Sequence, residues 1–178
     1  MKTAQDHDAP LRLIEATVAV NDQRKRAMGR KVLAAMDGNV RGQTVAVLGL
    51  TFKPNTDDMR DAPSIAIIQT LQDAGAKVRA YDPEGMEAAK AVLTDVEYAS
   101  SAYAAADGAA ATVIVTEWDA FRALDLTRLK AMMADPLLVD LRNIYRPAQA
   151  EAAGLRYVGI GRPGNPDEEE VLSERHAA

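Results

Sequence analysis

The first 36 residues of the chain include apolar residues three or four positions apart, which is the spacing of one face of a helix. These residues are Leu11, Ile14, Val18, Met28, Val32 and Met36. They predict one helix from Asp8 to Met36, with Asp8 as N-cap and Pro10 in the first turn. A helix of that length would span roughly 40 Å, which is longer than a small domain needs. We expect either a solvated helix packed along its own domain or a helix whose apolar stripe is covered by a second chain.

After this helix, from Gln43 to about Gly161, short apolar runs alternate with segments of helical spacing. The runs that predict strands are TVAVLGL (44–50), KVRAY (77–81), VEYA (96–99), ATVIVT (111–116), LLVDL (137–141) and LRYVGI (155–160). Helical segments are expected at 64–74, 84–93 and 124–134. Such alternation predicts an α/β fold: a Rossmann-like, doubly wound parallel sheet with strand order 3-2-1-4-5-6, preceded by the long helix.

Three regions follow from this pattern. Residues 1–40 are expected to form the long helix, and residues 41–161 the Rossmann-like domain. Residues 162–178 contain glycine, proline and a cluster of acidic residues, and we expect a flexible acidic tail.

Composition narrows the possible functions. The 178 residues carry a formal net charge of −5, so we expect no nucleic-acid partner. No apolar run approaches the roughly 20 residues of a membrane-spanning helix, and we expect no membrane partner and a cytoplasmic location. There is no cysteine and there are only two histidines, His7 and His176, both in polar terminal segments. The chain therefore has no thiol and almost no imidazole for catalysis or metal binding, and we assign no catalytic residue and no metal ligand.

Charged or aromatic residues follow four of the predicted strands, at the edge where open α/β sheets bind ligands. They include Lys53 and Phe52 after the first strand, Asp82 after the second, Trp118 after the fourth and Arg142 after the fifth. This arrangement predicts a small-molecule site.

The nature of the polar groups favours a phosphate ligand. The first strand–helix turn has the single glycine Gly49 and no G-x-G-x-x-G fingerprint, so the backbone is not built to hold a dinucleotide pyrophosphate closely. Lys53, Arg60 and Arg142 instead offer side-chain donors for phosphate or pyrophosphate. The competing interpretations are a solvated Lys53, an ion pair of Arg60 with a neighbouring aspartate, and a pair of Arg142 with Asp140 or the C-terminal segment.

Several spaced motifs resemble the UDP-glucose/GDP-mannose dehydrogenase family. GLTFKPNTDDMRDAPS (49–64) is similar to the stretch that opens the last domain of these enzymes. YDP (81–83), TEWDAF (116–121) and DLRNIYRP (140–147) follow in the family's order, and VNDQRKRAMGRKV (20–32) resembles its central helix. The resemblance covers roughly residues 11–161. The family often has glycine at the position of Leu141, so the approach of the backbone to a ligand is expected to differ there.

The resemblance implies a function. The UDP-glucose branch oxidises UDP-glucose to UDP-glucuronate with two NAD, through a thiohemiacetal on a cysteine. This chain resembles the UDP-sugar-binding and dimerising portion, with UDP-glucose or UDP as ligand and a homodimer formed through the long helix. Phe52, Lys53 and Arg142 match positions that contact the UDP-sugar, and Arg60 matches an arginine that reaches the NAD, which is held mainly by a domain absent here.

Because no cysteine is present, we expect this chain alone to be inactive. Two alternatives stay open: a non-catalytic Rossmann-like scaffold or regulatory module, and the same portion of a UDP-N-acetyl sugar or GDP-mannose dehydrogenase. A complete small NAD-dependent enzyme is disfavoured, because both the fingerprint and a catalytic base are missing.

Overall fold

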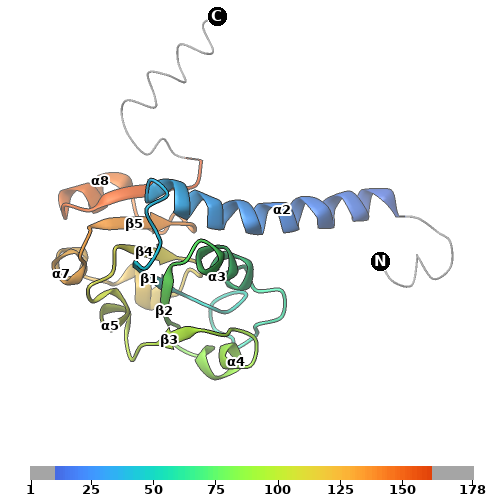
Figure 1. The fold of residues 1–178 in the computed structure, drawn as a ribbon, viewed down its shortest axis with the longest axis horizontal. Helices are drawn as coiled ribbons and strands as arrows, with labels where there is room; N and C mark the ends of the chain where they lie inside the picture. The colour runs from blue at the N-terminus through green and yellow to red at the C-terminus, as the bar shows by residue number, and fades with distance from the viewer. Residues whose placement is uncertain (1–10, 162–178) are drawn as a thin grey trace, which may run out of the picture.

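The computed structural model describes residues 11–161, and it shows an α/β domain with a long helix that extends beyond it (Figure 1). Six parallel strands form one sheet: β1 (Thr44–Leu48), β2 (Lys77–Tyr81), β3 (Val96–Tyr98), β4 (Ala111–Ile114), β5 (Leu137–Asp140) and β6 (Arg156–Gly159). Their order is β3-β2-β1-β4-β5-β6, which confirms the predicted Rossmann-like topology. Each predicted strand is present, and β2 has the predicted bounds.

Seven helices accompany the strands within the described residues. They are α2 (Arg12–Ala35), α3 (Pro63–Asp73), α4 (Met86–Lys90), α5 (Ala102–Ala106), α6 (Asp119–Arg122), α7 (Leu126–Met132) and α8 (Pro147–Ala152). Sequence periodicity missed α5, α6 and α8, because helices of four to six residues are too short to show an apolar period. None of the helices described is long and apolar enough to cross a membrane.

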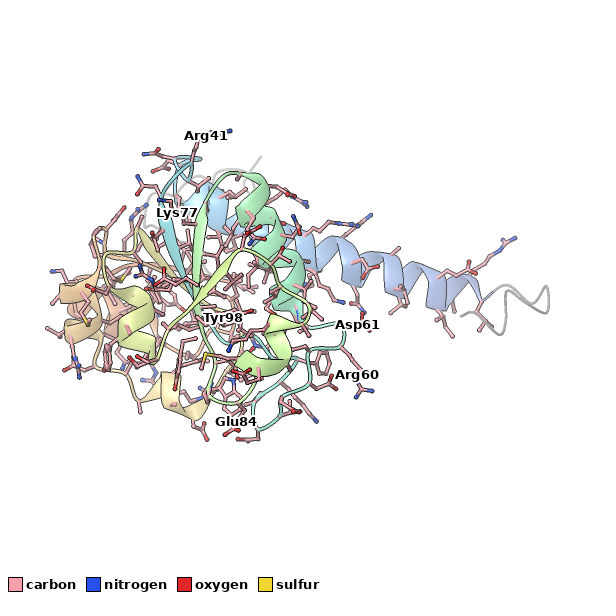
Figure 2. All side chains as sticks on the ribbon, turned by 60° about the horizontal axis from the view of Figure 1, so that its bottom comes forward. Arg41, Arg60, Asp61, Lys77, Glu84 and Tyr98 are labelled. Carbon is pink, nitrogen blue, oxygen red and sulfur yellow. The ribbon has the colours of Figure 1, made fainter. Side chains whose placement is uncertain are left out.

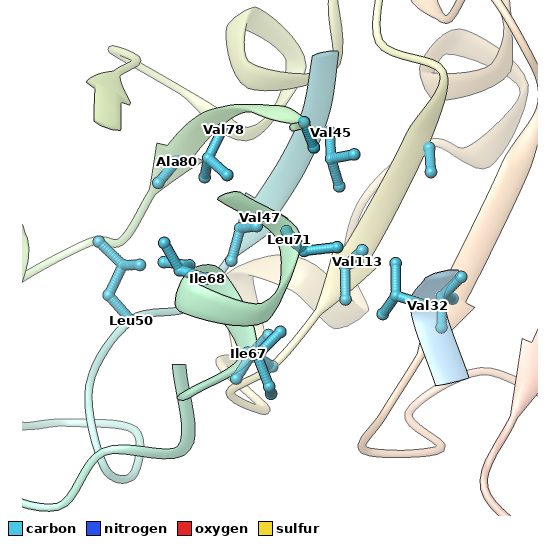
Figure 3. Packing of buried hydrophobic residues seen from close by; sticks show 14 of the residues in the cluster. Val32, Val45, Val47, Leu50, Ile67, Ile68, Leu71, Val78, Ala80 and Val113 are labelled. Atoms are coloured by element: carbon cyan, nitrogen blue, oxygen red, sulfur yellow. The ribbon is translucent and has the colours of Figure 1, made fainter. Parts of the chain in front are cut away.

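Alternate residues of each strand serve two separate cores, as expected for a sheet covered on both faces. Val45 and Val47 of β1 face the cluster formed with α3 and the end of α2. Ala46 and Leu48 face the second cluster, with helices α5 to α8. Figure 3 shows the first cluster, where Val32 of α2 lies near Val113 of β4. The central strands are therefore buried on both faces and mostly apolar, which explains the continuous run in the sequence.

Only the second half of α2 packs on the domain. Gly29, Val32 and Met36 are buried, and Gly29 lies against Thr70 of α3 so closely that an added Cβ would be 2.6 Å from the Cβ of Thr70. The first half projects past the sheet (Figure 1) and exposes a set of large apolar side chains, namely Leu11, Leu13, Ile14, Val18 and Val20.

The predicted helix start at Asp8 and the predicted tail at 162–178 lie outside the described residues. Within the described part, α2 ends at Ala35, one residue before the predicted end. The division into a helix of residues 1–40 and a domain of residues 41–161 stays a prediction.

Candidate functional site

A cavity of about 650 Å³ lies between α2 and the carboxyl ends of β1, β4, β5 and β6. Its floor is apolar, and its residues are Ile67, Val115, Leu141 and Ile160. One wall comes from α2, through Val18, Asn21, Asp22, Arg24, Lys25 and Met28. The rim carries Phe52, Asp61, Pro63 and Arg142. An apolar floor with a few charged groups around it is the usual composition of a small-molecule site.

Two of the predicted substrate residues line this cavity together. Phe52 follows β1 and Arg142 follows β5, and 90 residues of sequence separate them. Phe52 is 53% exposed although it is a large aromatic residue. An exposed ring and a guanidinium that line one cavity can offer one apolar and one cationic contact to the same ligand.

Arg142 is held from two sides. Its backbone N–H donates to Asp140 at 3.0 Å, which fixes the turn after β5. Its guanidinium makes two parallel hydrogen bonds to Glu117, from Nε at 2.5 Å and from Nη2 at 2.7 Å. This bidentate bond holds the pKa of the Glu117 carboxyl below its ordinary value. Asp140, one predicted competing partner, accepts from the backbone N–H and not from the guanidinium, and the other, the C-terminal segment 162–178, lies outside the described residues.

Lys53 and Arg60 lie on the same loop as Phe52, but neither lines the cavity. Lys53 is exposed. Arg60 binds Asp58 through Nε at 3.0 Å and Nη2 at 2.8 Å, and its side chain is 90% exposed. Figure 2 shows Arg60 on the outer side of the loop. This pair lowers the pKa of Asp58 to about 2, and it matches the competing interpretation of Arg60 as a partner of a neighbouring aspartate.

The start of the loop is fixed by the buried carboxylate of Asp82, at the end of β2. It accepts hydrogen bonds from Leu50, Thr51, Glu84, Gly85 and Trp118. A further backbone bond, from the N–H of Phe52 to the carbonyl of Asp58 at 2.8 Å, closes the loop on itself. The backbone of Phe52 is therefore held in place by hydrogen bonds, although its side chain is exposed.

A Rossmann fold usually binds its dinucleotide between the ends of β1 and β4. In this chain that space is filled by contacts between the two strand ends. A Cβ added at Gly49 would lie 2.6 Å from the backbone nitrogen of Thr116, and the hydroxyl of Thr116 donates to the carbonyl of Thr51 at 2.8 Å. Ligand space is found instead on the side of the sheet that α2 covers.

Two of the residues expected at the edge, Asp82 and Trp118, point inward, and so does Asp140 at the end of β5. Asp82 and Asp140 are fully buried, and Asp140 accepts hydrogen bonds from Tyr145 and Tyr157 as well as from Arg142. Trp118 is 6% exposed, and its indole N–H donates to Asp82 at 3.1 Å. These side chains order the loops and are not available to a ligand.

Sequence reasoning missed the contribution of α2 to the site. Asn21, Arg24 and Lys25 belong to the polar segment NDQRKR, which interrupts the apolar stripe in the middle of the helix. The clue in the sequence was this polar break in the apolar stripe, at the point where the helix crosses the edge of the sheet. The cavity carries charges of both signs, the cations Arg24, Lys25 and Arg142 and the acids Asp22 and Asp61, and Lys25 forms an ion pair with Asp22 at 3.8 Å. In residues 11–161, no cluster of side chains suits a metal ion.

The fold and the cavity define a nucleotide-binding type of α/β domain, and comparisons with known proteins identify the type. Residues 46–147, more than half of the chain, match the family model described as UDP-glucose/GDP-mannose dehydrogenase family, UDP binding domain. The chain belongs to this family.

Relatives point in the same direction. The chain is 64% identical over 163 residues to a UDP-glucose 6-dehydrogenase of Rhizobium meliloti (strain 1021), covering 92% of this chain and 37% of the relative. It is 40% identical to the UDP-glucose 6-dehydrogenase TuaD of Bacillus subtilis (strain 168), covering 92% of this chain and 35% of the relative. The chain thus spans about a third of the length of these curated relatives.

Solved structures agree with the fold. A UDP-glucose dehydrogenase of Pyrobaculum islandicum superposes with a TM-score of 0.70 at 31% identity, over 89% of this chain and 34% of that one. A UDP-D-ManNAc dehydrogenase of Pyrococcus horikoshii superposes with a TM-score of 0.74 at 23% identity, over 91% and 36%. The second likeness, at this identity, concerns the fold alone.

Proposed function

We propose that this chain binds the UDP portion of UDP-glucose, as the UDP-binding part of a UDP-glucose 6-dehydrogenase. The observation that carries the proposal is that Phe52 and Arg142 line one cavity in a chain of this family. The 64% identity to a UDP-glucose 6-dehydrogenase favours the UDP-glucose branch over the UDP-N-acetyl sugar and GDP-mannose branches.

The proposed roles follow the chemistry of each side chain. Phe52 gives apolar contact, while Arg142 and Lys53 give charge-assisted hydrogen bonds to the nucleotide sugar. Lys53 is exposed and lies off the cavity wall, so its long flexible side chain has to reach the ligand from the rim. Arg60 points outward, which suits its proposed contact with NAD held elsewhere.

In this proposal the full reaction is the oxidation of UDP-glucose to UDP-glucuronate with two NAD. The residues of this chain bind and orient the nucleotide, and orientation holds the reacting end of the sugar at a fixed place. They include no cysteine for a thiohemiacetal, so we propose that the chain alone turns over no substrate. A cytoplasmic location stays a prediction from the sequence.

Calorimetric titration of the chain with UDP, GDP and NAD tests the binding. We expect UDP to bind with a Kd of about 10 µM to 1 mM, because Phe52 and Arg142 are 53% and 41% exposed and would shield a ligand only partly from water. Arg142→Ala and Lys53→Ala should each weaken UDP binding about tenfold or more. Unchanged UDP affinity in both variants would refute the site.

The other outcomes separate the alternatives. Binding of none of the three ligands supports the scaffold interpretation, and preference for GDP supports the GDP-mannose branch. Incubation with UDP-glucose and NAD should yield no NADH above background. Steady NADH production by the purified chain would refute the proposal that these residues only bind.

We further propose that α2 mediates homodimerisation. The exposed apolar side chains of its first half support this, because Leu13 is 85% and Val20 60% exposed on a face opposite to the one that packs on the domain. Sedimentation at micromolar concentration should show a dimer. The double variant Leu13→Glu, Val20→Glu should be monomeric, and a wild-type chain that is strictly monomeric would count against the proposal.

A further inference from the structure

Glu117 forms an ion pair with Arg142, and the proposed function gives this carboxylate no role. It follows β4, and its side chain is 27% exposed against 41% for Arg142. Arg142 is among the residues that line the cavity and Glu117 is not, so the pair meets the ligand space through Arg142.

The geometry of the pair leaves a defined set of donors free. A guanidinium has five N–H groups: one on Nε and two on each Nη. Glu117 takes one from Nε and one from Nη2, which is the lateral edge of the plane. The end of the plane, with one N–H from each Nη, can still bind a second oxyanion with two parallel hydrogen bonds. No hydrogen bond within the described residues occupies Nη1.

We propose that Glu117 is a positioning residue for UDP binding: it holds the guanidinium of Arg142 so that its free end presents two donors to the diphosphate. This rests on the proposed function of the cavity. Glu117 stays bound to Arg142 in the complex, and the ligand adds to the pair without replacing it. The backbone of Arg142 is fixed by Asp140 and its head by Glu117, so both ends of a long side chain are ordered before the ligand arrives.

Glu117 has two opposite effects on the binding of a diphosphate, and its direct contact with Arg142 decides which one is larger. Its negative charge repels a diphosphate, but this charge is neutralised by the guanidinium that it contacts directly. Ordering a free arginine side chain costs conformational entropy, and the ion pair removes that cost from the binding step. We therefore expect the loss of Glu117 to weaken the binding of UDP.

A double-mutant cycle tests the inference. Glu117→Gln keeps the size of the side chain but has one acceptor atom in place of two. It should raise the Kd for UDP about fivefold in the wild-type background and less than twofold in the Arg142→Ala background. Binding of uridine, which has no phosphate, should change less than twofold in either background. Asp119→Asn, at a 99% exposed carboxylate two residues further on, is the control and should bind UDP as the wild type does.

The Arg142 Nε–H group gives a readout that needs no ligand. In ¹⁵N-labelled protein its resonance should be protected from exchange with water in the wild type and lose that protection in Glu117→Gln, while the thermal unfolding midpoint shows that the variant folds. Tighter UDP binding by Glu117→Gln would overturn the inference, because repulsion would then dominate. Equal weakening in both backgrounds, or equal weakening for uridine, would also overturn it and leave the UDP site standing. A wild-type chain that binds no UDP would instead refute the proposed function, and with it the inference.

Discussion

Replacement of Asp82 by asparagine should strongly destabilise the domain. The side chain is fully buried, and both of its oxygens are used. Oδ1 accepts from the backbone N–H groups of Glu84 at 3.0 Å and Gly85 at 2.7 Å. Oδ2 accepts from Leu50 N–H at 2.7 Å, Thr51 N–H at 3.3 Å, Thr51 Oγ1 at 3.4 Å and Trp118 Nε1 at 3.1 Å.

Asparagine replaces one oxygen with an NH₂ group, which donates and cannot accept. In either orientation of the amide, at least two backbone N–H groups lose their acceptor. Hydrogen bonds to a charged group contribute about 1.5–3 kcal/mol each, and the neutral amide is less costly to bury than the carboxylate. The net loss should therefore be about 3 kcal/mol, a large part of the roughly 5–15 kcal/mol of a typical domain.

Urea denaturation followed by circular dichroism measures this loss, and the thermal midpoint should fall by about 6–12 °C. The control is Asp119→Asn, because that carboxylate is 99% exposed and its ion pair with Arg122 is 3.7 Å long. It should stay within about 0.5 kcal/mol of the wild type. A loss below about 1 kcal/mol for Asp82→Asn would show that these hydrogen bonds do not carry the stability of the loop.

Three further predictions concern the loop and its surroundings. Arg60→Ala should leave the Kd for UDP within about threefold in a calorimetric titration, because Arg60 points away from the cavity; a tenfold loss would place it on the ligand side. Gly49→Ala should lower the free energy of unfolding by about 3 kcal/mol or more, since Gly49 has φ +91° and its Cβ would overlap Thr116. Gly38→Ala, with φ +71° and open space, should cost only about 1 kcal/mol, and equal losses would contradict the overlap. The wild type should be more stable to heat than Glu117→Gln above pH 4.5, and this difference should disappear as the pH falls below 4.5, because the folded-state pKa of Glu117 is lowered. A difference that persists when Glu117 is protonated would contradict an ionic origin.

The sequence by itself determined the fold and its family. The continuous apolar runs of β1, β4 and β5 required a sheet covered on both faces, and their alternation with helices gave the parallel topology. Periodicity encodes these features because burial on a regular element depends on the position of a residue within a few neighbours. The motifs that surround Phe52 and Arg142 were sufficient to indicate the family and the ligand class.

Only the tertiary structure decided which polar residues at the sheet edge remain available. Asp82 and Trp118 appeared equivalent to Arg142 in the sequence, but they turn inward, and the bonds that join Asp82 to Leu50, Thr51 and Trp118 span 31 to 36 residues of the chain. The pairing of Arg142 with Glu117, 25 residues before it, depends in the same way on the adjacency of β4 and β5. The side of the sheet that holds the cavity was likewise decided by where α2 packs. The direction of a polar side chain is set by donors and acceptors brought together from distant segments, and local spacing carries no record of them.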